Sequence, residues 1–356
     1  MATIKQRDSG WWQAIIRRKG YPNHSKTFEY HDEAKAWARD IESEMDKGLF
    51  LDRREADKNT LGAILTRYRD EVAMQHKGGD VEIIRINVLL NDQIAHYKMS
   101  ALSGAALSDW ISRRQTVVKS ATVRRELDII SQAITKARRA WGVHLSENPV
   151  SLIERPKPAK ARDRRLSEAE ESALLSALED HAGHGKKYRQ GTRNPWIKPL
   201  VMLALETAMR RGELLDLEWR YVDLARCFVH LPETKNGSAR DVPLSTHALA
   251  ILSALPRSIT GKVFPVTANA VHGAWDRAVA RAQSDYEKEC QAKGIRPLAG
   301  FMDNLRFHDL RHEATSRLAE KLSNILKLSS VTGHKDLRML KRYYHPRAED
   351  LAKELG

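Results

Sequence analysis

The chain has 356 residues, of which 42% are hydrophobic, and a formal net charge of +14. This length predicts two or three domains, and the charge favours a polyanionic partner, most commonly nucleic acid, over a basic enzyme without one. Two cysteines, Cys227 and Cys290, cannot build a disulfide framework or a cysteine-rich zinc site. Residues 1–20 lack an apolar signal core and no stretch approaches a membrane span, so we expect a protein of a reducing cytoplasm, away from membranes.

Residues 1–55 are predicted to form a ββα module. Strands are expected at 10–19 and 25–30, with a turn between them, and a helix at 32–47 with Asp32 as its N-cap.

Charge separates along this module. Residues 1–28 carry six Lys or Arg against one acid, whereas residues 29–55 carry nine acids and five bases. A basic ribbon backed by an acidic helix fits the major groove of DNA, so Arg17, Arg18 and Lys19 are candidate DNA-binding residues. The alternative is an interaction module in which the tryptophans are plain core.

Residues 60–152 are predicted to be a helical domain. Apolar residues at helical spacing indicate helices at 60–75, which Thr60 caps, and at 81–90, 105–115 and 121–141. Lys119, Arg124 and Arg125 lie on or beside the last helix. They form either a solvated face or a surface that follows DNA phosphates.

Residues 153–166 are predicted to be an extended linker, because two prolines and six Lys or Arg leave little to bury. Its basic residues, Arg164 and Arg165 among them, are candidates for contact with a DNA backbone.

Residues 167–356 are predicted to form a mostly helical domain with a small sheet. Ser167 and Glu170 have the spacing of a capping box, and 195–207 is an apolar helix. Strands at 227–231 and 241–244 flank an Asn-Gly turn signal, and 308–320 has a helical pattern. The whole chain is therefore mainly α with small β elements, an α+β class.

Six polar residues of this domain suit the cleavage of a phosphodiester. A tyrosine hydroxyl can keep the phosphate covalently attached, two arginines can hold the charge on its oxygens, a lysine can protonate the leaving oxygen and histidines can bind phosphate or move protons. Each residue alone is weak evidence, whereas the ordered set is not. The set is Arg210, Lys235, His308, Arg311, His334 and Tyr343.

The pair His308 and His312 has an i,i+4 spacing that also suits zinc. Because the acidic helix motif of metalloproteases does not accompany the pair, we expect neither a metal nor another cofactor.

The motifs TAMRRGELLDLEW, TKNGSARDVPL, HDLRHEAT and TGHKDLRMLKRYYHP, in this order and spacing, resemble those of the tyrosine recombinases, specifically the phage-type integrases. The resemblance covers the whole chain. It implies an arm-type DNA-binding module at 1–55, a core-binding domain at 60–152, the basic linker 153–166 and a catalytic domain at 167–356. Ala208 stands where the family often has glycine.

The resemblance also implies residue roles. Tyr343 would be the nucleophile that forms a 3′-phosphotyrosyl link, since the family places one residue between the nucleophile and a following histidine, and Tyr344 is then that spacer. Arg210 and Arg311 would clamp the phosphate and Lys235 would be the general acid. His308 would be a base or proton shuttle, and His334 would donate to the phosphate.

The implied function is site-specific integration or excision of a mobile element in the cytoplasm of a bacterial host, in association with the nucleoid. The implied partners are double-stranded DNA attachment sites, three further copies in a homotetramer on DNA, and a DNA-bending host factor or an excisionase. The segment 347–355 is expected to be a helix that docks on a neighbour. A type IB-like topoisomerase and a catalytically silent DNA-binding regulator are the alternatives.

Overall fold

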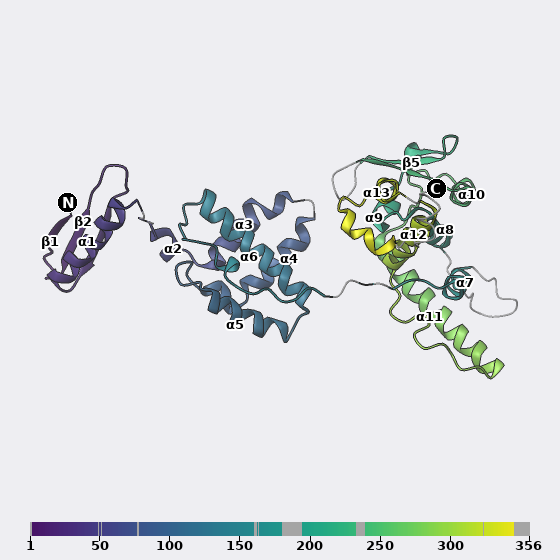
Figure 1. Cartoon of the computed structure of the whole chain (residues 1–356), viewed down its shortest axis with the longest axis horizontal. Coiled ribbons are helices and arrows are strands. Elements are labelled where there is room, and N and C mark those ends of the chain that lie inside the picture. Colours follow the sequence, from purple (N-terminus) through teal and green to yellow (C-terminus); the bar gives the residue numbers. More distant parts are fainter. Residues whose placement is uncertain are drawn as a thin grey trace, which may run out of the picture. The chain divides into compact units, whose positions relative to one another are not determined.

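The computed structural model describes residues 2–48, 50, 52–76, 78–159, 162, 164–179, 194–232, 239–322 and 324–344. The chain divides into two compact units, Met1–Ala161 and Arg162–Gly356, each of which is described by itself. Helices dominate both units, and each unit has one three-stranded antiparallel sheet (Figure 1). The predicted α+β class is therefore confirmed. Within the described part of the chain, no helix has the length and apolar character needed to cross a bilayer.

The N-terminal module is a three-stranded sheet with one helix packed on it. The strands pair in the order β1-β2-β3. Ala14 and Ile16 of the middle strand are buried with Ala34 and Ala38 of the helix, which explains why this face of the strand is apolar. The elements are β1 (Thr3–Gln6), β2 (Trp12–Ile16), β3 (His24–Phe28) and α1 (His31–Asp46).

Two details of this module differ from the prediction. The sequence predicts two strands, and β1 is a third, too short and too polar to stand out as a pattern. Asp32 is predicted to cap α1, but the N-cap is Tyr30, two residues earlier. Asp32 lies in the first turn, where a carboxylate still favours the helix dipole.

The rest of the first unit is a helical bundle. Its helices follow the predicted ones within a few residues, and Thr60 Oγ1 accepts a hydrogen bond from Ala63 N at 3.1 Å, which confirms the predicted cap. Leu65, Leu127 and Ile130 are fully buried at its centre. The helices are α2 (Arg54–Lys58), α3 (Leu61–Glu71), α4 (Gly79–Leu90), α5 (Gly104–Gln115) and α6 (Ser120–Ala140), with 3₁₀ turns η1 (Ala73–Gln75), η2 (Gln93–His96) and η3 (Pro149–Ser151).

In the second unit the predicted elements are present. The capping box of Ser167 and Glu170 is confirmed, with both hydrogen bonds formed. The apolar helix α8 packs against α12, and α13 packs against both α12 and the last strand of the sheet β4-β5-β6. The helices are α7 (Glu168–Ala177), α8 (Ile197–Thr207), α9 (Arg211–Asp216), α10 (Thr246–Ser253), α11 (Ala268–Lys293), α12 (Phe307–Lys321) and α13 (Ile325–Thr332). The strands are β4 (Val222–Asp223), β5 (Phe228–Leu231) and β6 (Arg240–Pro243), and the 3₁₀ turns are η4 (Trp219–Tyr221), η5 (Leu337–Met339) and η6 (Lys341–Tyr343).

Two of these packings position the site. Because α8 and α12 lie side by side, the C-terminal end of α8 comes next to residues of the first turns of α12. Because α13 contacts β6, the strand that follows the predicted lysine hairpin lies against the end of α13.

Two helices of the second unit were not predicted. They are α10 and α11, which lie within 246–293.

Candidate active site

The end of α8 forms the first part of the site. The helix stops at Ala208, whose φ of 51° and ψ of 22° are left-handed. Glycine adopts this conformation without steric cost, so the glycine common in the family at this position has a physical reason. Two residues on, Arg210 donates its backbone N–H to Glu213 Oε2 at 2.8 Å and its Nη1 to Oε1 at 2.6 Å.

Glu213 joins two arginines. Arg240, at the start of β6, donates Nη1 and Nη2 to the same carboxylate at 3.0 and 2.7 Å. Burial by itself raises the pKa of Glu213, but the hydrogen bonds from Arg240 and Arg210 outweigh it and lower the pKa to about 2. The carboxylate is therefore ionised at neutral pH and holds the two guanidinium groups together.

Arg311 lies on the second turn of α12 and is only 5% exposed. Its Nη1 donates to the carbonyl of Ala208 and its Nη2 to the carbonyl of Thr332 at 2.6 Å. Burial and the nearby charge of Arg210 lower the pKa of Arg311 to about 10, which leaves it charged at neutral pH. A carbonyl does not neutralise that charge, so this arginine keeps a positive charge that a phosphate can use.

The loop after α13 closes against the same arginines. Arg210 Nη2 donates to the carbonyl of Gly333 at 3.4 Å, and Arg240 Nε donates to the carbonyl of Val331 at 3.2 Å. Gly333 has a φ of 69°, and a Cβ at this position would lie 2.8 Å from Arg240 Nη1. Glycine therefore avoids both the backbone strain of this conformation and a clash with the arginine.

His334 follows this glycine. Its Nδ1 is 2.7 Å from Thr332 Oγ1, which fixes the ring beside the arginines. Burial and the charges of Arg311 and Arg210 lower the pKa of His334 to about 4, so the imidazole is neutral at pH 7. Because Thr332 Oγ1 donates its proton to the carbonyl of Leu328 at 2.7 Å, Nδ1 of His334 is the donor to Oγ1, and the second ring nitrogen carries the lone pair while the ring is neutral.

Tyr343 ends η6 and is half-buried among the apolar residues of α12 and α13. Its hydroxyl is hydrogen-bonded to His312 Nδ1, and the two rings are stacked with centroids 5.9 Å apart. Burial raises the pKa of Tyr343, although Arg342 and Arg311 partly oppose this, so the phenol is protonated at neutral pH.

The structure thus brings four of the six predicted residues into one region. Arg210, Arg311 and His334 meet at the backbone of 331–334. The Tyr343 hydroxyl joins this region because it is hydrogen-bonded to His312, the residue that follows Arg311. His308 is exposed, and its ring meets the edge of the His312 ring at 5.2 Å. Lys235 and the segment 347–355 lie outside the described residues.

The predicted DNA-binding residues of the first unit lie at its surface. Arg17, Arg18, Lys19, Lys119 and Arg125 are exposed. Arg18 pairs with Asp46 at 2.5 Å, and Arg124 Nη1 donates to the carbonyl of Pro156 at 2.9 Å. The charge of Arg18 is therefore partly neutralised within the protein, whereas the carbonyl leaves the charge of Arg124 in place.

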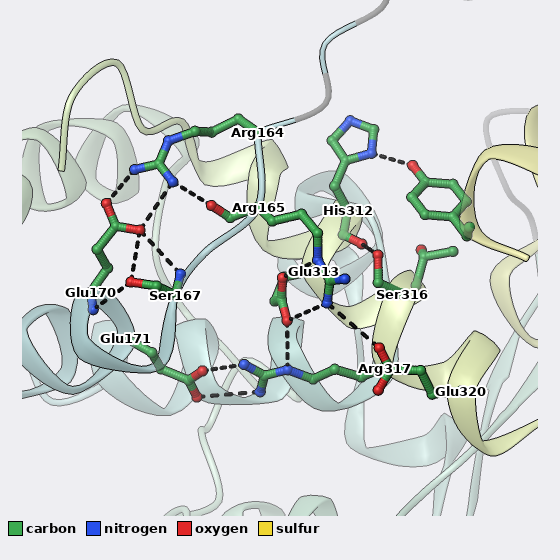
Figure 2. A network of polar contacts seen from close by, with 12 residues as sticks. Arg164, Arg165, Ser167, Glu170, Glu171, His312, Glu313, Ser316, Arg317 and Glu320 are labelled. Atoms are coloured by element: carbon green, nitrogen blue, oxygen red, sulfur yellow. Dashed lines mark hydrogen bonds and ion pairs between the residues drawn. The ribbon is translucent and has the colours of Figure 1, made fainter. Parts of the chain in front are cut away.

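The linker arginines have partners in the second unit. Arg164 donates to both carboxylate oxygens of Glu170, and Arg165 pairs with Glu313 at 3.0 Å (Figure 2). Arg162 pairs with the buried Asp309 of α12 at 2.6 Å. The described linker residues lie in no helix or strand, and these three arginines are held by carboxylates of the second unit. Their contact with DNA remains a prediction.

Two residues of the site were missed from sequence. Arg240 stands in the motif TKNGSARDVPL but carried no assignment, because an arginine at the start of a strand is usually solvated. His312 was considered only as a zinc ligand. Its sequence signal was its place beside Arg311, one turn after His308 on the same helix.

Comparison with known proteins identifies relatives over most of the chain. Residues 164–350 match the phage integrase family. The chain is 35% identical over 307 residues to the shufflon-specific DNA recombinase of Escherichia coli, covering 84% of this chain and 72% of that protein. It is 26% identical to the integrase of Salmonella phage P22 over 63% of this chain and 54% of that one.

Solved structures share the fold. A lambda integrase dimer bound to a COC′ core site superposes with a TM-score of 0.62 at 19% identity, over 97% of this chain and 95% of that one. The Tn1549 transposon integrase in complex with circular intermediate DNA gives a TM-score of 0.61 at 17% identity, over 84% and 99%.

The chain belongs to the phage integrase family of tyrosine recombinases, which confirms the resemblance drawn from its motifs. It is a tyrosine site-specific DNA recombinase. The comparisons favour neither the topoisomerase nor the silent regulator.

Proposed function

We propose that this chain cuts and rejoins DNA at attachment sites through a 3′-phosphotyrosyl intermediate on Tyr343. The Tyr343 hydroxyl attacks phosphorus, and the 5′ oxygen of the next nucleotide leaves. The energy of the broken bond is retained in the phosphotyrosine, so the reverse attack by a 5′ hydroxyl rejoins DNA without a nucleotide cofactor. The proposal depends on one observation. Arg210, Arg311 and His334 all contact the backbone or side chains of residues 331–334, and the Tyr343 hydroxyl is hydrogen-bonded to His312, next to Arg311.

The arginines supply the charge that the reaction needs. The transition state gathers negative charge on the non-bridging oxygens, and Arg210 and Arg311 would bind these oxygens with forked donors. His334 would donate to one of them from its second ring nitrogen after the ring takes a proton, which the negative charge of a bound phosphate favours. Lys235 would protonate the leaving oxygen, as its place between β5 and β6 suggests, because a hairpin tip can reach into a groove.

The remaining parts would hold the duplex. The module at 1–55 would bind arm-type sites and the bundle at 60–152 the core site. The linker 153–166 would join that bundle to the catalytic domain at 167–356. The basic residues Arg17, Arg18, Lys19, Lys119, Arg124 and Arg125 support this assignment through their surface positions. Solved relatives include a lambda integrase tetramer bound to a Holliday junction, which supports a homotetramer on DNA for this chain.

In the cell, the protein would integrate or excise a mobile element in a bacterial cytoplasm, at the nucleoid. A DNA-bending host factor or an excisionase would set the direction.

One experiment tests the proposal on whole genomic DNA and so needs no defined attachment site. The protein is incubated with genomic DNA from its host, covalent complexes are trapped with denaturant, and the attached strand ends are sequenced. We expect a short recurrent sequence with protein on the 3′ phosphate. Adducts scattered over unrelated sequences would instead indicate a topoisomerase, and the absence of adducts a DNA-binding regulator.

A further inference from the structure

The hydrogen bond of the Tyr343 hydroxyl goes to His312, not to the histidine that the family resemblance designates. The Nδ1 of His312 contacts the hydroxyl, and the rings stack at an angle of 26°. His308 lies one turn earlier on α12 and meets His312 edge-on, at an angle of 86°. His312 thus stands between His308 and the reacting oxygen.

The direction of this hydrogen bond follows from the surroundings. Burial, followed by the charges of His308 and Arg342, lowers the pKa of His312 to about 4, and burial raises the pKa of Tyr343. At neutral pH the imidazole is therefore neutral and the phenol protonated. The phenol donates, and Nδ1 accepts with its lone pair. This is the starting geometry for transfer of the phenol proton.

We propose that His312 is the general base that accepts the Tyr343 proton during strand cleavage. The inference rests on the proposed role of Tyr343 as nucleophile. The bond from Tyr343 Oη to phosphorus forms and the bond from phosphorus to the 5′ oxygen breaks. The phenol proton passes to His312 Nδ1, and Lys235 supplies the proton that the 5′ oxygen takes. In rejoining, His312 returns its proton to the leaving phenol.

Bound DNA strengthens this base. The groups that face His312 are positive or neutral apart from one carboxylate, and a phosphate held by Arg311 offsets that positive charge. The imidazolium that forms is then stabilised by the anion beside it. The groups facing His312 are His308, Asp309 and Arg311 from α12, Arg342 and Tyr343 from η6, and His334.

The test is single-turnover cleavage of a nicked suicide substrate by the full-length protein. His312→Ala removes both the hydrogen bond and the base, so we expect cleavage to slow by about 100-fold or more. His312→Asn keeps an acceptor near the place of Nδ1 but cannot take a proton. It should retain the native melting temperature and DNA affinity and still cleave slowly. His272→Asn, an exposed histidine on α11, is the matched control and should cleave normally.

Two further readouts distinguish a base from a packing residue. Free imidazole should partly restore cleavage by His312→Ala, because the substitution leaves a space beside the phenol that imidazole can fill. The wild-type rate should fall at acid pH as His312 takes a proton from solvent, and His312→Asn should lose this acid limb. Slow cleavage with no imidazole rescue and an unchanged pH profile would contradict the proposal.

A sulfur leaving group separates the base from the acid. A substrate with a 5′-bridging sulfur needs no proton on its leaving group, so it should restore cleavage by Lys235→Ala but not by His312→Asn. Restoration of both variants would remove His312 from the base role.

The outcome that overturns the proposal outright is normal or faster cleavage by His312→Ala. His312 would then be a latch that restrains Tyr343 in the DNA-free protein. That result leaves the proposed function intact, provided that the wild type forms adducts and Tyr343→Phe does not. If both of these proteins form adducts, the nucleophile itself is wrong.

Discussion

Helix α12 has an arginine on each of two sides, and the two arginines have different partners. On one side Arg311 donates to two backbone carbonyls, and His312 contacts the Tyr343 hydroxyl. On the other, Glu313 pairs with Arg165 and Arg317, and Arg317 in turn pairs with Glu171 of α7 (Figure 2).

The partners explain the difference in use. A carboxylate beside a guanidinium cancels its charge and fixes it, so the Glu313 side fastens the linker and α7 to α12. Carbonyls hold the guanidinium of Arg311 in place without cancelling its charge, so it remains ready for an anion. An arginine count therefore says little about DNA contact until the acceptor of each arginine is known.

The largest effect should come from Tyr343. Tyr343→Phe removes the nucleophile, so covalent protein–DNA adducts on a nicked suicide substrate should disappear entirely. Tyr344→Phe, the adjacent tyrosine, is the control and should form adducts normally. Adducts in the first variant and none in the second would show that the nucleophile is Tyr344.

Arg311→Lys tests the catalytic side of α12. Lysine keeps the charge but loses the fork, so we expect cleavage to fall by about 100- to 1000-fold. Arg317→Lys, on the other side, should lower the free energy of unfolding by about 1–3 kcal/mol and leave the cleavage rate of the folded protein unchanged. Equal losses of cleavage in the two variants would erase the distinction between the sides.

Glu213→Gln tests the buried carboxylate that joins Arg210 and Arg240. Both guanidinium groups lose their counter-charge in a buried setting, so denaturant unfolding should show a loss of about 3–5 kcal/mol, accompanied by slower cleavage. Glu320→Gln is the matched control, since that side chain is 70% exposed and its pair with Arg165 is long at 3.8 Å. We expect less than about 1 kcal/mol for it.

Acid should destabilise the catalytic side through its two buried histidines. His312 and His334 have folded pKa values of about 4 against 6.5 in an unfolded chain, so only the unfolded chain binds protons between these pH values. The free energy of unfolding should therefore fall as pH drops from 6.5 towards 4. The double variant His312→Asn/His334→Asn should show a shallower fall in melting temperature, and an unchanged slope would contradict the buried setting of these rings.

The smallest effect concerns DNA affinity. Lys19→Gln removes an exposed charge and should lower the slope of log affinity against log salt by about 1. Arg165→Gln should lower the slope by less, because the charge of Arg165 is already paired with Glu313. Filter binding over a salt series measures both. An equal fall in the two variants would show that the ion pair leaves Arg165 as available to DNA as Lys19.

The sequence by itself determined the features that depend on neighbouring residues. The Thr60 cap, the Ser167–Glu170 capping box and the helix that carries Arg311 are set within a few positions of the chain, since capping and periodicity act over one or two turns. The ordered motifs also determined the family, because their residue types are those that the chemistry requires.

Only the tertiary structure decided which partner each charged residue takes. Arg165 and Glu313 are 148 positions apart, and Arg240 reaches Val331 across 91. His312 and Tyr343 are 31 apart and join because α13 and the turns after it pack back onto α12. A local pattern contains no information about such distant neighbours, and it is packing of the apolar core that brings them within hydrogen-bonding distance.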